Sequence, residues 1–212
     1  MLANTTGYNN VAVGFESLDA NTDGYDNVAI GKGALGANTT GDAAVAVGRD
    51  ALASNTTANK NVAVGHQALL YNTTGAANIA IGDGALKANT TAGTNTAVGN
   101  EAALTNTTGT DVVAIGRQAL KLNTTGANLT ALGNGALFNN TTANDNVAIG
   151  TSSLYFNTTG HSNVAVGKQA SFTNTTGEKN IAVGYQSGFN VTSGTHNIHI
   201  GCLLYTSPSP RD

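Results

Sequence analysis

The sequence predicts an all-β protein, a parallel β-solenoid (β-roll) of about twelve 17-residue coils, and three observations support this. Glycine recurs every 17 residues without exception. The residues around it recur as the unit Asn-Thr-Thr-Gly-x-x-Asn-Val-Ala-Val-Gly-x-x-Ala-Leu-x-x, and 27 glycines with no tryptophan are unlike a mixed globular enzyme domain. A short unit at fixed period buries its apolar face only by stacking on its neighbours. The glycines are Gly14, Gly31, Gly48, Gly65, Gly82, Gly99, Gly116, Gly133, Gly150, Gly167, Gly184 and Gly201.

The segment 10–14 and its equivalents predict one strand in each coil, because apolar and small residues alternate there and many are β-branched. The rows of Val11 and Val13 are almost entirely aliphatic, with Thr96 and Thr130 as exceptions. Alternate side chains of a strand share a face, so we expect both rows to point into the core.

The row between them is alanine in eleven of twelve coils. An exposed strand face would vary more, so constant alanine indicates a steric limit, either a thin coil interior or an apposed neighbouring subunit. Each coil buries few aliphatic side chains, and this burial offsets only part of the conformational entropy that is lost when 17 residues become ordered. We therefore expect copies of the chain to associate side by side. The possible subunit interface is Ala12, Ala29, Ala46, Ala63, Ala80, Ala97, Ala114, Ala131, Ala148, Ala165 and Ala182.

Glycine ends each strand, and the two variable residues after it predict a solvent-facing turn. Ala-Leu follows, with the leucine closing the core opposite the valines. In three coils the bulky residue is displaced by one position, to Leu104, Phe172 and Phe189. A second strand is expected to run on into Asn-Thr-Thr, before glycine or alanine turns the chain back.

The asparagine row allows three interpretations. The first is a ladder of stacked amides that bond to each other and to their turn backbones. The second is N-glycosylation, since most of the row fits Asn-x-Thr, as do Asn128, Asn139 and Asn190 off register. The third is a flat array that binds ice or polysaccharide, although each coil can present only one of its adjacent threonines outward. The row positions that fit both ladder and glycosylation are Asn4, Asn38, Asn55, Asn72, Asn89, Asn106, Asn123, Asn140, Asn157 and Asn174.

The sequence offers no support for an enzyme, a cofactor or a metal site. The aspartates fall on different repeat positions, so no carboxylate ladder forms, and His196 and His199 are expected on opposite faces of a strand. A net charge of -3 without a basic cluster gives no footprint for nucleic acid, and no apolar run is long enough to span a membrane.

The repeat domain covers residues 1–201, and we expect it to be truncated at both ends, because Met1 falls on a leucine position of the unit. Residues 202–212 hold the only cysteine and both prolines. They resemble a translated sequencing adapter, so we expect a non-native tail, with a disordered natural tail as the alternative.

The unit Asn-Val-Ala-Val-Gly-x-x-Ala-Leu resembles the head repeats of trimeric autotransporter adhesins, whose coils are typically shorter. With Asn-Thr-Thr-Gly included, residues 4–201 look like the repetitive stalks of bacterial and phage-derived proteins that end in a tail-fibre chaperone domain. The resemblance implies a left-handed β-roll that assembles as a homotrimer into an extracellular, cell-surface or virion fibre. We therefore expect a structural fibre segment of an adhesin or tail fibre that self-associates and contacts a surface glycan or receptor. The alternative is a monomeric ice-binding or polysaccharide-binding module that uses the Asn-Thr-Thr ladder.

Overall fold

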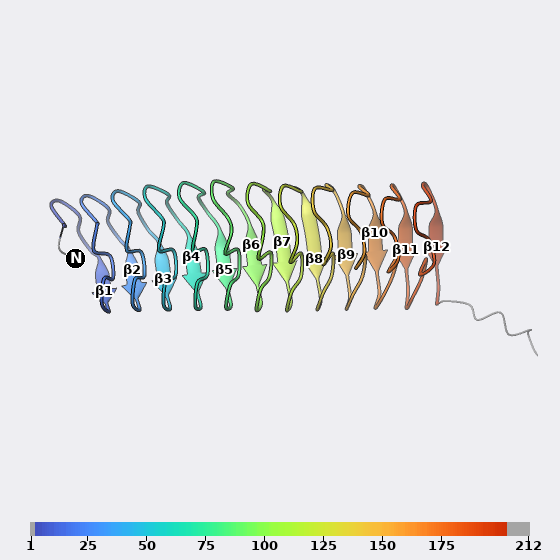
Figure 1. The fold of residues 1–212 in the computed structure, drawn as a ribbon, viewed down its shortest axis with the longest axis horizontal. Helices are drawn as coiled ribbons and strands as arrows, with labels where there is room; N and C mark the ends of the chain where they lie inside the picture. Colours follow the sequence, from blue (N-terminus) through green and yellow to red (C-terminus); the bar gives the residue numbers. More distant parts are fainter. Residues whose placement is uncertain (1–2, 203–212) are drawn as a thin grey trace, which may run out of the picture.

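The computed structural model describes residues 3–202, and this part of the chain contains twelve short strands and no helix. Figure 1 shows the strands side by side in chain order. They are β1 (Val11–Val13), β2 (Val28–Ile30), β3 (Val45–Val47), β4 (Val62–Val64), β5 (Ile79–Ile81), β6 (Thr96–Val98), β7 (Val112–Ile115), β8 (Leu129–Leu132), β9 (Val147–Ile149), β10 (Val164–Val166), β11 (Ile181–Val183) and β12 (Ile198–Ile200).

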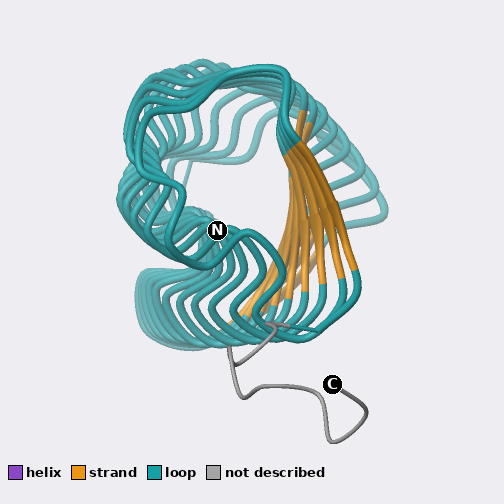
Figure 2. Cartoon of the chain, turned by 90° about the vertical axis from the view of Figure 1, so that its right-hand side faces the viewer, coloured by secondary structure: helices purple, strands orange, loops and turns teal. Residues whose placement is uncertain are grey.

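The strands form one parallel sheet in which each residue pairs with the residue 17 positions further on. Val45 pairs with Val62, and Ala46 with Ala63. Seen along the axis, the strand occupies one side of each coil and turns make up the remainder (Figure 2). The predicted all-β, parallel β-solenoid is confirmed.

The predicted second strand in each coil is wrong. In the described residues the Asn-Thr-Thr segment forms a bend after a turn, although its backbone still bonds from coil to coil, as in Thr39 N–H to the Thr56 carbonyl at 2.8 Å. The chain cannot run straight into this segment, because the residues before it are in the left-handed region. Asp50 and Leu52 have φ of 57° and 51°. These residues bend the chain where strand propensity predicts extension.

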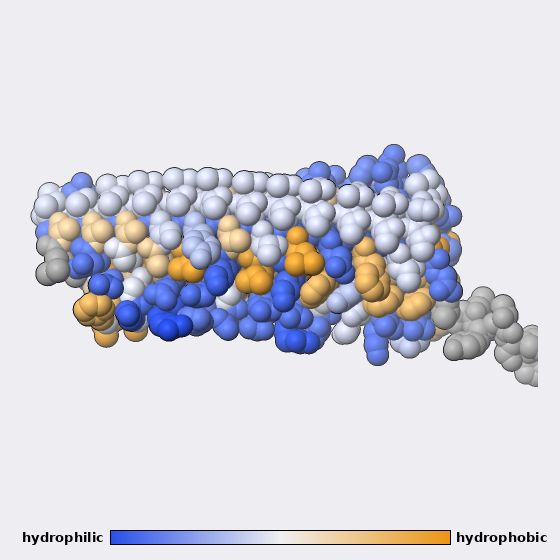
Figure 3. Space-filling model, in the orientation of Figure 1, coloured by the Kyte–Doolittle hydropathy of each residue, from blue (hydrophilic) through white to orange (hydrophobic). Residues whose placement is uncertain are grey.

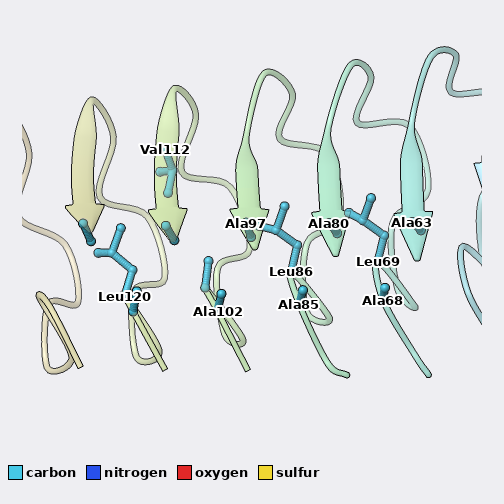
Figure 4. Packing of buried hydrophobic residues seen from close by; sticks show 14 of the residues in the cluster. Ala63, Ala68, Leu69, Ala80, Ala85, Leu86, Ala97, Ala102, Val112 and Leu120 are labelled. Carbon is cyan, nitrogen blue, oxygen red and sulfur yellow. The ribbon is translucent and has the colours of Figure 1, made fainter. Parts of the chain in front are cut away.

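The facing of the strand rows is also the reverse of the prediction. The middle alanine points into the coil, where it meets the buried leucine row (Figure 4), and the flanking valines and isoleucines point outward. The interior of so small a coil holds one alanine from the strand plus the Ala-Leu pair, which leaves no room for two β-branched side chains. The alanines are therefore core residues and not a subunit interface: Ala29, Ala46, Ala63, Ala80, Ala97, Ala114, Ala131, Ala148, Ala165 and Ala182 are 0% exposed, and Ala12 is half-buried.

Where the bulky residue is displaced, the backbone position of the leucine stays in place. Ala103, Ser171 and Gly188 occupy it, each with positive φ, and the displaced side chains lie half-buried outside the core. At Gly188 the missing leucine side chain is explained by a neighbouring residue. A Cβ there would lie 3.3 Å from Cδ2 of His199, which replaces the alanine in β12. The glycine makes room for that imidazole.

The glycine that ends each strand has the conformation that the sequence predicts. Gly99 has φ +140°, and a Cβ on it would lie 2.6 Å from the carbonyl oxygen of Gly116 in the next coil. Both the backbone angle and the approach of the next coil exclude a side chain. This explains why the row has no exception.

Candidate functional surfaces

The asparagine row forms a buried amide ladder, as one of the three interpretations predicts. From Asn21 on, Nδ2 of each asparagine donates to Oδ1 of the asparagine one coil earlier, at 2.7 to 3.4 Å. It also donates to the carbonyl three residues on, at 2.9 to 3.0 Å. From Asn21 to Asn174 these side chains are at most 1% exposed. Both amide hydrogens are therefore used inside the fold, and no sugar can be attached there while the coils are stacked.

A second asparagine row, which begins at Asn10 and was predicted to start each strand, lies just before the strands. Asn27 Oδ1 accepts the backbone N–H of Ala44 at 2.9 Å, and its Nδ2 donates to the Gly41 carbonyl at 2.8 Å. Asn61 repeats the pattern, and both side chains are 0% exposed. The signal that could have found this row is its recurrence ahead of the Val-Ala-Val segment.

The two threonines of each coil differ in exposure. The first is half-buried, and its Oγ1 donates to the carbonyl of the equivalent threonine in the next coil, as in Thr39 to Thr56 at 3.0 Å. The second is exposed, as at Thr40, Thr74 and Thr91. The outer surface therefore presents a single file of threonines, about 4.8 Å apart along the axis.

The strand side of the solenoid is an exposed apolar strip, defined here by the outward rows that begin at Val11 and Val13. Ile81, Ile115 and Leu132 expose 40%, 37% and 41% of their surface. Only Thr96 and Thr130 interrupt the strip between β1 and β12. The side of the molecule seen in Figure 3 has rows of intermediate hydropathy along its upper half and hydrophilic residues below, with hydrophobic residues in separate groups.

The turn after each glycine carries polar and charged side chains that interact from coil to coil. His66 lies between Arg49 and Asp83, with its Nδ1 3.0 Å from Asp83 Oδ1. Lys121 Nζ donates to Glu101 Oε2 at 2.8 Å, and this bond is the main cause that holds the Glu101 pKa below its usual value. These contacts at the surface stabilise the fold only weakly, and the residues that make them differ from coil to coil.

Aromatic rings stack along one corner of the later coils. Ring centroids are 5.0 Å apart for Phe138 and Tyr155, 5.5 Å for Tyr155 and Phe172, and 5.2 Å for Phe172 and Phe189. Because neighbouring rings cover each other, most of these ring faces are not open for stacking against a sugar. The cluster stabilises neighbouring coils.

Comparison with protein-family models, with curated proteins and with solved structures finds no match to this chain. Among residues 3–202 no three His, Cys, Asp or Glu side chains are grouped so that they could hold a metal ion. The same residues include no helix that could cross a membrane. Cys202, the first residue of the predicted non-native tail, is exposed; the rest of that tail, 203–212, lies outside the described residues.

Proposed function

We propose that this chain is a structural fibre segment of an extracellular adhesin or tail fibre, and that copies of it associate side by side through the apolar strip. The observation that carries the proposal is the combination of a regular rod with one long apolar side. The rod supplies length and stiffness, and the variable turn residues supply contacts to a surface glycan or receptor. No catalytic role enters this proposal.

The size of the apolar strip supports a second copy of the chain as its occupant. Twelve of its Val, Ile and Leu residues expose between 37% and 78% of their surface, and they recur along the whole sheet. A contiguous exposed apolar patch of this kind is typical of a protein–protein interaction site. A second rod offers a strip of the same length and period, so equivalent coils can meet along the whole sheet.

The test is the solution mass of the full chain by light scattering, for the wild type and for two double variants. We expect the wild type to be an oligomer. Val47→Lys with Ile81→Lys places two charges in the apolar strip and should give monomers. Thr74→Lys with Thr91→Lys places the same charges on the exposed threonine file and should leave the oligomer intact. A monomeric wild type would refute the association, and an oligomer insensitive to the first pair would refute the interface.

The exposed threonine file supports a second candidate, a module that binds ice or a polysaccharide as a monomer. The ladder asparagines cannot take part, because they are buried and fully hydrogen-bonded. The same variants separate the two functions. Thr74→Lys with Thr91→Lys should abolish such binding, and unchanged retention on ice or insoluble polysaccharide would exclude this candidate.

A further inference from the structure

The asparagine ladder ends at Asn174, and the way it ends exposes another asparagine. The Oδ1 atom of Asn174 is buried and has no hydrogen-bond partner, because Val191 occupies the ladder position of the next coil. The asparagine of that coil stands one residue earlier, as Asn190. The segment Asn190-Val191-Thr192 therefore keeps the Asn-x-Thr pattern but is displaced by one residue from the ladder.

This displacement leaves the amide of Asn190 on the outside of the coil. Asn190 and Thr192 are both exposed, and the Asn190 side chain makes no hydrogen bond within the described part of the chain. Asn174, in contrast, is 1% exposed, and its Nδ2 donates to Asn157 and to the Gly177 carbonyl at 3.0 Å each. An enzyme that must reach the amide nitrogen and the threonine hydroxyl can reach both in the 190–192 segment without opening a coil.

The other two Asn-x-Thr segments off the register lack this combination. Asn139 is half-buried and its Nδ2 donates to the Tyr155 carbonyl at 2.8 Å, while Asn140 after it is part of the ladder. Asn128 is exposed, but Leu129 after it is 0% exposed and belongs to β8. Both segments are fixed in the solenoid by their middle residues.

Within the ladder row, Asn4 is the one exposed member among the described residues. It keeps two of the three ladder contacts. Its Nδ2 donates to the Gly7 carbonyl at 2.9 Å, and its Oδ1 accepts from Asn21 at 2.9 Å. Exposure alone therefore does not free its amide.

We propose that Asn190 is a modification site, the preferred acceptor of an N-linked sugar on the folded chain, with a nucleotide-activated sugar as the donor. In this step Nδ2 of Asn190 forms a bond to the anomeric carbon of the sugar. The bond between that carbon and the phosphate oxygen of the donor breaks, the nucleotide leaves with the electron pair, and Nδ2 gives up one proton. The proposal is independent of whether the chain forms a fibre.

The experiment incubates the full folded chain with a soluble Asn-x-Ser/Thr-specific glycosyltransferase and UDP-glucose, and maps hexose by peptide mass spectrometry. We expect hexose on Asn190 at least tenfold faster than on any ladder asparagine, on Asn139 or on Asn128. Asn190→Gln and Thr192→Ala should abolish this product, whereas Thr192→Ser should retain it. Asn139→Gln is the matched control, because it removes a segment of the same repeat position, and it should change nothing.

A urea-unfolded sample shows that the enzyme is competent on the ladder segments, which should then accept hexose. The proposal is overturned if the folded chain gains no hexose on Asn190 while the unfolded chain is modified. It is equally overturned if the ladder asparagines, Asn4 or Asn128 are modified on the folded chain as fast as Asn190.

Discussion

Replacing one ladder asparagine by aspartate tests the buried amide ladder with almost no change in shape. Asn72 is 0% exposed, and its Nδ2 donates to Asn55 Oδ1 at 3.1 Å and to the Gly75 carbonyl at 2.9 Å. In Asn72→Asp an oxygen takes the place of Nδ2 and faces two acceptor oxygens. A protonated carboxyl can donate to one of them, and an ionised carboxylate to neither.

The expected loss has a constant part and a part that depends on pH. The hydrogen bond that even a protonated aspartate cannot restore costs about 1 to 2 kcal/mol. Full burial beside two acceptors raises the pKa of the new carboxyl in the folded state, and a rise of about 3 corresponds to about 4 kcal/mol once the group is ionised in the unfolded chain. This second part is absent below the unfolded pKa of about 3.9 and grows as the pH rises towards the folded pKa. We expect a total loss of about 5 kcal/mol at pH 7 and about 1 to 2 kcal/mol near pH 4.

The assay is urea unfolding at several pH values, followed by far-UV circular dichroism and by hydrogen exchange of the peptides that cover residues 55–92. Local exchange is needed because coils of a solenoid can open in part. Asn59→Asp is the matched control. Asn59 is exposed, and only its Oδ1 is used, accepting the Asp42 N–H at 2.8 Å. A carboxylate can accept this bond equally well. If the two variants lose the same stability at pH 7, or if the loss in Asn72→Asp does not change with pH, the reasoning is refuted.

Three further substitutions, the first with a control, test other parts of the fold. Gly99→Ala should lose more than about 2 kcal/mol in urea unfolding, because of its φ and the adjacent carbonyl. Gly33→Ala, in a row where other residues share its φ, should lose only about 1 kcal/mol. Leu86→Ala removes a 0% exposed side chain and should cost about 3 kcal/mol in the same assay. Glu101→Gln should cost less than about 1 kcal/mol at neutral pH, because the side chain is 33% exposed. The bond from Lys121 lowers the pKa of Glu101, so it stabilises the wild type only while Glu101 is ionised. The stability difference between Glu101→Gln and the wild type should therefore shrink as the pH falls through that pKa. Thermal melting at pH 3 and pH 7 measures whether the difference is smaller at the lower pH.

Period, strand position and the role of the glycines could be predicted from the sequence, but the inward face of the strand was predicted wrongly. Alternation shows that Val45 and Val47 share one face and that Ala46 has the other, and it does not show which face is inside. The row whose side-chain size varies least is the better indicator of the inward face. A side chain outside a coil can grow into solvent, whereas one inside meets the leucine opposite, so constant alanine indicates the interior and mixed valine and isoleucine the outside.

The second missed feature is the turn that replaces the expected second strand. Leucine rarely has positive φ, so Ala-Leu before Asn-Thr-Thr favours continued extension by propensity alone. In the coil, Leu52 has φ 51° and is 0% exposed. Burial of the leucine side chain and coil-to-coil backbone hydrogen bonds, such as Leu52 N–H to the Ala68 carbonyl at 3.0 Å, offset a local cost of about 1 to 2 kcal/mol. Such a tertiary effect has no signature in a single coil.

The distribution of polar groups explains how one sequence can define both the stack and its outer surface. An apolar interior alone would tolerate slippage of one coil against the next, because Ala and Leu pack without direction. Asn38 and Asn55 remove this freedom, since each amide finds its partner only at a shift of 17 residues. An unpaired buried amide costs about 1 to 3 kcal/mol, so every coil penalises a wrong register. With register set by hydrogen bonds inside, the aliphatic residues of the strand are not needed in the core, and they lie outside, on the apolar strip that we propose as the contact between rods.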